Sequence, residues 1–403
     1  VERAADDALR QGLADRRFCY VLGPKASGKT SLMARTIRGL RADGQLAAVV
    51  DLTQIGARGE STEAGRWFYS IAYRIVRELR IKVDLQSWWQ EKSVLLREQR
   101  LSEFFWEIVL ANTTAPVTIF FDEIERALDL PYAGELFAAL SNCYNSRATE
   151  PDYQRLNFVV IGVATPRQLG RGVTLPLFLD GLAIEPRDFT LEETYGLVEG
   201  FGTGEAQAQA ALNRVHYWVK GQPYLTQKIS RAVARRSGNP DDVDSIVRSQ
   251  FLTQGARDEE PLLNHVAGQL TGGGPHKRRA LILLKKLGKG TPIIADIESP
   301  AQEALRLSGI SANRDEEFLT YRNRLVKSVF TSRWASSALP FDWRGAAVAA
   351  VAVLIMILLP IWYTNYFPRP YIDTLTAVTN NYAVALDTHD KLRRFPGFGS
   401  TAD

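Results

Sequence analysis

The sequence contains only two cysteines and four histidines among its 403 residues. So few of these residues argue against a domain held together by disulfide bonds and against one held together by zinc. Cys19 and Cys143 stand far apart in the chain and belong to no metal or redox motif, so they predict a reducing compartment rather than a disulfide framework. The four histidines lack the spacing of zinc ligands, and we expect no zinc site. A chain of this length can form two or three domains with substantial cores.

The sequence also lacks a large excess of either basic or acidic residues. The 49 basic and 45 acidic residues leave a formal net charge of +4, which does not by itself indicate a nucleic-acid partner. One basic cluster could contact DNA phosphates. Its members are His276, Lys277, Arg278, Arg279, Lys285, Lys286 and Lys289. Because such runs are more commonly the solvated face of a helix, we do not expect nucleic acid to be the partner.

The chain does have a complete phosphate-binding sequence, since residues 23–30 read Gly-Pro-Lys-Ala-Ser-Gly-Lys-Thr. Its glycines let backbone N–H groups turn towards phosphate oxygens, and a strand-like run (17–22) precedes it and a helical pattern (31–40) follows it. Lys29 would reach the β- and γ-phosphates of ATP, and the Thr30 hydroxyl would bind Mg²⁺. The predicted nucleotide-binding residues are Gly23, Pro24, Lys25, Ala26, Ser27, Gly28, Lys29, Thr30 and Ser31.

A second motif lies at 116–124, an apolar strand that ends in adjacent carboxylates. In a parallel sheet the carboxyl ends of the strands face the ligand crevice beside the phosphate loop. Asp122 would then hold Mg²⁺, and Glu123 would orient and deprotonate the attacking water, with Lys29 as the second catalytic group. The two motifs together predict a site for ATP and Mg²⁺ with ATPase chemistry.

Further strands at 46–51 and 157–164 alternate with helical segments, which predicts an α/β fold with a parallel sheet and helices on both faces. Two more residues are candidates near the nucleotide. Thr165, just after the last of these strands, either senses the γ-phosphate or caps the next segment. Arg147, at the end of the preceding helix, either supplies charge to a neighbouring subunit's nucleotide or is a solvated helix-end arginine.

From Phe189 onward the pattern becomes helical, beginning with a capping box at Thr190. A Gly-x-Pro turn ending at Pro223 interrupts two helices. Segments further on suggest two short helices and a small hairpin, the outline of a winged helix. We therefore predict an ATPase core over 1–188, a helical lid over 189–255 and a winged-helix domain over 256–340.

The stretch 345–363 carries no charge and is long enough, at about 1.5 Å per residue, to cross a hydrocarbon core of about 30 Å. Aromatic residues typical of membrane interfaces flank it, namely Trp343, Trp362, Tyr363 and Tyr366. Basic residues precede it, namely Arg322, Arg324, Lys327, Arg333 and Arg344, whereas Arg369 follows it. The pattern predicts a single-pass inner-membrane protein with the ATPase part in the cytoplasm and a tail, 364–403, outside. The alternative is a buried core helix.

The motifs together resemble the AAA-like ATPase module of bacterial STAND proteins, signal-transduction ATPases with numerous domains. Besides the two motifs above, the segments that carry the resemblance are 51–56, 143–147, 162–166 and 221–228. It implies an AAA+-type P-loop NTPase core, a lid, a winged helix, and a switch in which ADP holds a closed monomer and ATP favours an oligomer. It also implies that Pro223 packs near the nucleotide. The segment 174–181 departs from the family pattern, which puts sensor chemistry there in doubt.

The leading hypothesis is therefore a membrane-anchored ATPase switch in signalling. A binding-only module that holds nucleotide structurally is one alternative. A DNA-associated ATPase is another.

Overall fold

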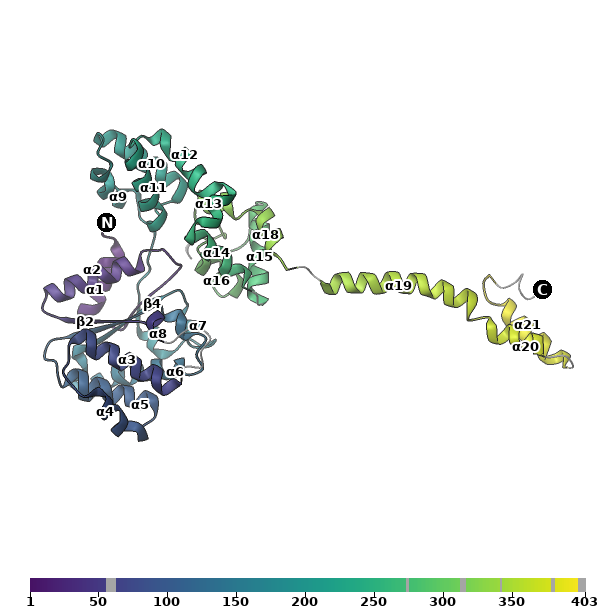
Figure 1. Cartoon of the computed structure of the whole chain (residues 1–403), viewed down its shortest axis with the longest axis horizontal. Helices are drawn as coiled ribbons and strands as arrows, with labels where there is room; N and C mark the ends of the chain where they lie inside the picture. Colours follow the sequence, from purple (N-terminus) through teal and green to yellow (C-terminus); the bar gives the residue numbers. More distant parts are fainter. Residues whose placement is uncertain (56–62, 273–274, 312–316, 341–342, 378–380, 398–403) are drawn as a thin grey trace. The chain divides into compact units, whose positions relative to one another are not determined.

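The computed structural model describes residues 1–55, 63–272, 275–311, 317–340, 343–377 and 381–397. The chain divides into two compact units, Val1–Leu339 and Pro340–Asp403. The first unit contains a sheet with helices on both faces, followed by a helical region (Figure 1).

The sheet has five strands in the order β2-β3-β4-β1-β5, and every pair is parallel. The strands are β1 (Cys19–Leu22), β2 (Leu46–Asp51), β3 (Val117–Asp122), β4 (Leu156–Gly162) and β5 (Leu182–Ala183). The predicted parallel α/β sheet is confirmed. The sequence did not indicate β5, because two residues are too few for a detectable alternation of side chains.

Side chains alternate between the two faces of the sheet, as the pleat requires. Cys19 and Val21 of β1 pack in the apolar cluster beneath α1 (Ala4–Ala14) and α2 (Lys29–Ala42). In β4, the neighbouring strand, Phe158 and Val160 point to the other face of the sheet and join a larger apolar cluster there. The helices that cover that face are α3 (Ala64–Leu79), α4 (Leu85–Glu91), α5 (Arg97–Glu103), a π-helical segment (Phe104–Leu110) and α6 (Ala133–Asn145).

Both cysteines lie in these clusters as buried free thiols. Burial raises the pKa of the Cys19 thiol and of the Cys143 thiol to about 12. Reaction needs the thiolate, whose fraction grows only as pH rises towards the pKa. At pH 8 we therefore expect both thiols of the native protein to react with a disulfide reagent at least about tenfold more slowly than in the urea-unfolded chain. The reaction can be followed by absorbance. Equal reaction rates in the native and the unfolded protein would contradict the burial of the two thiols.

After the sheet the chain is helical, as predicted. Short helices α7 (Pro166–Leu169) and α8 (Pro176–Asp180) lie between β4 and β5, and α9 (Leu191–Thr194) follows β5 and leads into the larger helices. These are α10 (Glu205–Val219), α11 (Pro223–Arg236), α12 (Pro240–Val247), α13 (Gln254–Glu259), α14 (Pro261–Thr271), α15 (Pro275–Gly288), α16 (Pro300–Ser308), α17 (Arg324–Val329) and α18 (Ser332–Ala338).

One apolar core runs from Phe201 to Ala335, through both of the segments predicted as lid and winged helix. Isolated antiparallel bridges join Ile294 to Phe318 and Ser311 to Tyr321. The capping box at Thr190 is present, since its hydroxyl accepts a hydrogen bond from the Glu193 backbone N–H at 3.2 Å.

The second unit contains α19 (Trp343–Asn365), α20 (Arg369–Ala377) and α21 (Tyr382–Arg393). By length and composition, one segment in the described residues, Ala347–Ala377, could cross a membrane. Within this unit the Tyr363 hydroxyl donates to the Pro396 carbonyl at 2.9 Å. Of the residues used in the sequence analysis, Gly56, the tail end 398–403 and the side chains of Trp343 and Arg344 lie outside the described part.

Candidate functional site

The phosphate loop joins the end of β1 to the start of α2, which is the strand–loop–helix order that the sequence predicts. Gly28 precedes the first residue of α2 with φ +83°, and Ala26 has φ +61°. Both values lie in the left-handed region, where glycine is favoured and alanine is uncommon. The Gly23 N–H donates to the Gly162 carbonyl at 3.0 Å and ties the loop to the end of β4. The loop therefore curves around the N-terminus of α2.

Lys29 lies inside this loop. Its side chain is buried, and its Nζ donates to the carbonyl oxygens of Gly23 at 2.9 Å and Pro24 at 2.8 Å. Burial lowers the Lys29 pKa to about 8, although the carboxylates of Glu125 and Glu123 act in the opposite direction. Thr30, the next residue, is exposed. An ammonium group and a hydroxyl are thus presented in the first turn of α2.

Carboxylates gather at the ends of the neighbouring strands. Asp51 and Asp122 are paired in the register of β2 and β3, and Asp122 is 9% exposed. Burial raises the pKa of Asp122, and Asp51 adds to this effect. Asp122 Oδ1 accepts from the Glu123 backbone N–H at 2.9 Å, and Glu123 itself has φ +55°. Burial and the nearby Glu125 raise the pKa of Glu123 to about 7.

Glu125 belongs to this group although the sequence analysis did not select it. Its Oε2 accepts a hydrogen bond from the Val163 N–H at 2.8 Å, just beyond β4. A methyl group added at Gly162 would lie 2.4 Å from the same oxygen, so the glycine leaves room for this carboxylate. The Glu125 side chain thus links the turn after β3 to the end of β4.

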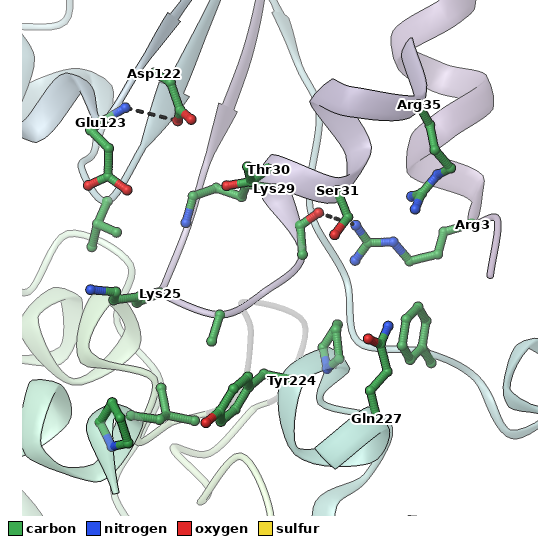
Figure 2. A pocket seen from close by; sticks show the side chains of 17 residues that line it. Arg3, Lys25, Lys29, Thr30, Ser31, Arg35, Asp122, Glu123, Tyr224 and Gln227 are labelled. Carbon is green, nitrogen blue, oxygen red and sulfur yellow. Dashed lines mark hydrogen bonds between the residues drawn. The ribbon is translucent and has the colours of Figure 1, made fainter. Parts of the chain in front are cut away.

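A cavity of about 400 Å³ opens beside the phosphate loop (Figure 2). Asp122 and Glu123 lie on one side of Lys29 and Thr30, and Arg3 on the other (Figure 2). The predicted residues that line it are Lys25, Ala26, Gly28, Lys29, Thr30, Ser31, Asp122, Glu123 and Pro223. Its remaining lining residues are Arg3, Arg35, Val163, Phe189, Tyr224, Gln227, Pro261 and Leu262.

Arg3 is one of the lining residues that the sequence gave no reason to select. It is 5% exposed, and its guanidinium donates to the carbonyls of Ser27 at 2.9 Å, Gly28 at 3.2 Å and Arg187 at 3.0 Å. It also lies over the Phe189 ring, 5.6 Å from the centroid. Nothing local marks an arginine before the first helix as part of a site. By contrast, Tyr224 and Gln227 lie in the segment 221–228 that carries the family resemblance, three residues apart on one helix face.

Arg147 does not lie as a solvated helix-end arginine, and it does not line the cavity. Its guanidinium donates to the carbonyls of Arg16 and Leu156 and, at 2.9 Å, to Asn157 Oδ1. It also stacks on the Tyr144 ring, 4.4 Å from the centroid. Burial lowers its pKa. These contacts tie the end of α6 to β4 within one chain, so the described geometry favours a structural role.

Thr165 caps the N-terminus of α7 and also contacts α16. Its hydroxyl accepts from the Gln168 N–H at 3.3 Å at the start of α7, and it donates to Glu303 Oε1 of α16 at 3.2 Å. It does not line the cavity.

Two further contacts join the helical region to the phosphate loop and to Asp188. The Gln222 amide donates to the Ala26 carbonyl at 2.9 Å. Arg322 forms a bidentate ion pair with Asp188, with Nε to Oδ2 at 2.8 Å. A methyl group added at Gly309 would lie 3.3 Å from Arg322 Nη1 and 3.6 Å from Pro24 Cβ. The helical region therefore packs directly against the loop.

Known structures share this fold. A Walker-type ATPase of Pyrococcus abyssi superposes with a TM-score of 0.54 at 14% identity, covering 81% of this chain and 94% of that one. The ORC2 protein of Aeropyrum pernix, solved as ADPNP–ADP complexes, gives 0.50 at 14% identity, covering 84% and 94%. At this identity the likenesses show a shared fold.

Sequence comparisons are more specific. An uncharacterized WD repeat-containing protein of Synechocystis sp. is 30% identical over 353 residues, which are 84% of this chain and 29% of that protein. The chain thus spans less than a third of the length of that relative. A family model described as an AAA-like domain matches residues 6–271, more than half of the chain. With its phosphate loop, acidic strand end and parallel sheet, this chain belongs to the AAA-like domain family.

Proposed function

We propose that the chain is a membrane-anchored ATPase of the STAND type, which binds Mg-ATP and slowly hydrolyses it as a conformational and oligomerisation switch in signalling. The observation that carries the proposal is the meeting of four groups at one cavity. Lys29 and Thr30 come from the start of α2, and Asp122 and Glu123 from the end of β3. Fold likeness alone would not supply a function, because one fold can host many.

The oxygen donors present fit Mg²⁺. A hydroxyl and one carboxylate suit this hard cation, which keeps several waters and usually takes only one or two carboxylates. Thr30 and Asp122 would hold it, with Asp51 beside Asp122 adding negative charge. Bound there, Mg²⁺ would neutralise charge on the phosphates.

The protein's own groups would do the rest. Backbone N–H groups between Lys25 and Thr30, at the N-terminus of α2, bind phosphate oxygens. The Lys29 ammonium compensates their charge. Glu123 orients a water and takes its proton, which requires the ionised carboxylate.

The cavity also has an apolar end, formed by Phe189, Pro223, Tyr224 and Leu262. Nucleotide sites commonly combine such walls with a few polar groups that fix orientation. We assign this end to the purine base and the loop end to the triphosphate.

The direct test is phosphate release by the purified full chain with Mg-ATP, together with the size of the particle in ADP and in a non-hydrolysable ATP analogue. We expect slow turnover and a larger particle with the analogue. Tight binding without turnover would favour the binding-only alternative, and no binding of any purine triphosphate would contradict the proposal.

The contacts of the helical region support the switch. Arg322–Asp188, Thr165–Glu303 and Gln222–Ala26 join the region after 189 to the core around the loop. A ligand can shift such an arrangement only by binding its two forms with different affinity. We propose that these contacts belong to the ADP-favoured form and that ATP releases them.

Arg322→Ala should therefore speed the release of a fluorescent ADP about fivefold, because a partly buried bidentate ion pair contributes on the order of 1 kcal/mol. The Arg322 side chain is 10% exposed and that of Asp188 is 22% exposed. Arg324→Ala is the matched control, since Arg324 is exposed and lies over the Tyr217 ring instead. Equal release rates for the two variants would exclude Arg322 as part of the switch.

The membrane part of the proposal rests on composition. The uncharged stretch 345–363 lies within the candidate span, and basic residues are concentrated before it. By the positive-inside rule we propose that the ATPase part lies in the cytoplasm, where ATP is, and the residues from 364 onward on the other side. The much longer WD repeat-containing relative is consistent with a module fused to further domains, as in STAND proteins.

A further inference from the structure

A charged group with a buried carboxylate lies behind the apolar end of the cavity, and its charges have no part in the proposed chemistry. It consists of Glu260, Lys228 and Tyr224, and we call it the Glu260 triad. Glu260 is 3% exposed. Its Oε1 accepts from the Tyr224 hydroxyl at 2.9 Å, and its other oxygen forms an ion pair with Lys228. Lys228 Nζ also donates to the Tyr224 hydroxyl at 3.3 Å. All three side chains therefore bond to one another.

The triad joins two walls of the cavity. Tyr224 and Lys228 are one turn apart on α11, directly after Pro223. Glu260 stands between α13 and α14 and caps the N-terminus of α14, where its Oε1 accepts from the Leu262 N–H at 3.4 Å. Tyr224, Pro261 and Leu262 all line the cavity. Figure 2 shows Tyr224 and Gln227 across the cavity from Asp122.

Stability alone gives little reason for this arrangement. The Glu260 carboxylate is removed from water, whereas the Lys228 side chain is 35% exposed. Removing a charge from water is costly, and buried charged groups can often be replaced by apolar side chains without loss of stability. Such groups are better explained where they impose one geometry. Here the Lys228 ammonium also lies 5.5 Å from the centroids of the Tyr224 and Phe251 rings. Its attraction to these rings limits the orientations that the Tyr224 ring and the Lys228 side chain can adopt. The result is a Tyr224 ring held in one orientation.

We propose that Glu260 and Lys228 are positioning residues, which hold the Tyr224 ring and the N-terminus of α14 as the wall against which the purine base packs. This inference rests on the proposed nucleotide function and adds the residues that set affinity for the base. The triad acts on the base end of the cavity only, because the phosphates are held by the loop at the other end.

The test compares two probes on the full chain, ATP and inorganic tripolyphosphate, which has the charge but no base. Glu260→Gln should weaken ATP binding about tenfold, and Tyr224→Phe, which keeps the ring and removes one hydroxyl, about threefold. Binding of tripolyphosphate should stay within about twofold of wild type in both. Because the two residues act through one bond, the double variant should lose about tenfold rather than about thirtyfold.

Glu259→Gln is the matched control, since Glu259 is the exposed neighbour of Glu260. Thermal unfolding shows whether each variant is folded, and Tyr224→Phe alone tests the inference if Glu260→Gln unfolds. Wild-type affinity for ATP in Tyr224→Phe and Glu260→Gln, or a parallel loss of ATP and tripolyphosphate, would overturn it. A wild-type chain that binds neither probe would instead contradict the proposed function.

Discussion

Lys29→Ala is expected to weaken ATP binding about 100-fold, the largest loss of affinity from one substitution in this chain. Its ammonium group is buried inside the phosphate loop and faces the carboxylates of Asp122, Glu123 and Glu125. Charge-assisted hydrogen bonds contribute about 1.5–3 kcal/mol, and about 1.4 kcal/mol corresponds to tenfold. Without the ammonium, those carboxylates would also repel the triphosphate. Calorimetric titration with ATP measures the effect.

Lys82→Ala provides the control, because Lys82 is exposed and the same charge is removed. We expect it to bind ATP as the wild type does. Tripolyphosphate binding should fall in Lys29→Ala as much as ATP binding, in contrast to the variants of the Glu260 triad. If Lys29→Ala is folded and binds ATP normally, the loop does not hold phosphate.

Glu123→Gln is expected to slow ATP hydrolysis by about 10²- to 10⁴-fold, the range typical for loss of a general base. The amide keeps the shape of the side chain but cannot accept a proton from water. Affinity for ATP should stay within about threefold, since the loop and Lys29 remain. The measurement is phosphate release at saturating Mg-ATP, with binding determined separately.

Glu199→Gln is a suitable control for this variant, because Glu199 is an exposed glutamate in the helical region. A switch that depends on turnover should also change in Glu123→Gln, which we expect to remain as the larger ATP-bound particle for longer. If neither turnover nor particle size differs from wild type, the chain is a binding module and not an ATPase.

Much of the core could be predicted from the sequence because its signals are local. β2 spans the predicted 46–51, and β3 and β4 each begin and end within two residues of their predicted bounds. Buried strands of a parallel sheet are nearly continuous apolar runs, which can be recognised in a single sequence. The phosphate loop was recognisable for the same reason, since eight consecutive residues carry its geometry.

The candidate site was only half predicted. Arg147 shows why part of the site could not be predicted. The sequence around an arginine at a helix end is the same whether its side chain faces solvent, a neighbouring subunit or carbonyl groups of its own chain. Only the packing of α6 beside β4 places Asn157 within 2.9 Å of its guanidinium. β5 was missed because its two residues form a strand only through pairing with β1.

What the sequence determined by itself is therefore the set of chemical groups at the loop end of the cavity. There, backbone conformation, an ammonium, a hydroxyl and a strand-end carboxylate follow from short contiguous motifs. The tertiary structure decided the rest of the cavity, because Arg3, Glu125 and Glu260 act through partners far away in the chain. Periodicity and propensity are local properties, whereas the meeting of α1, α11 and α14 around one loop depends on which apolar faces pack together.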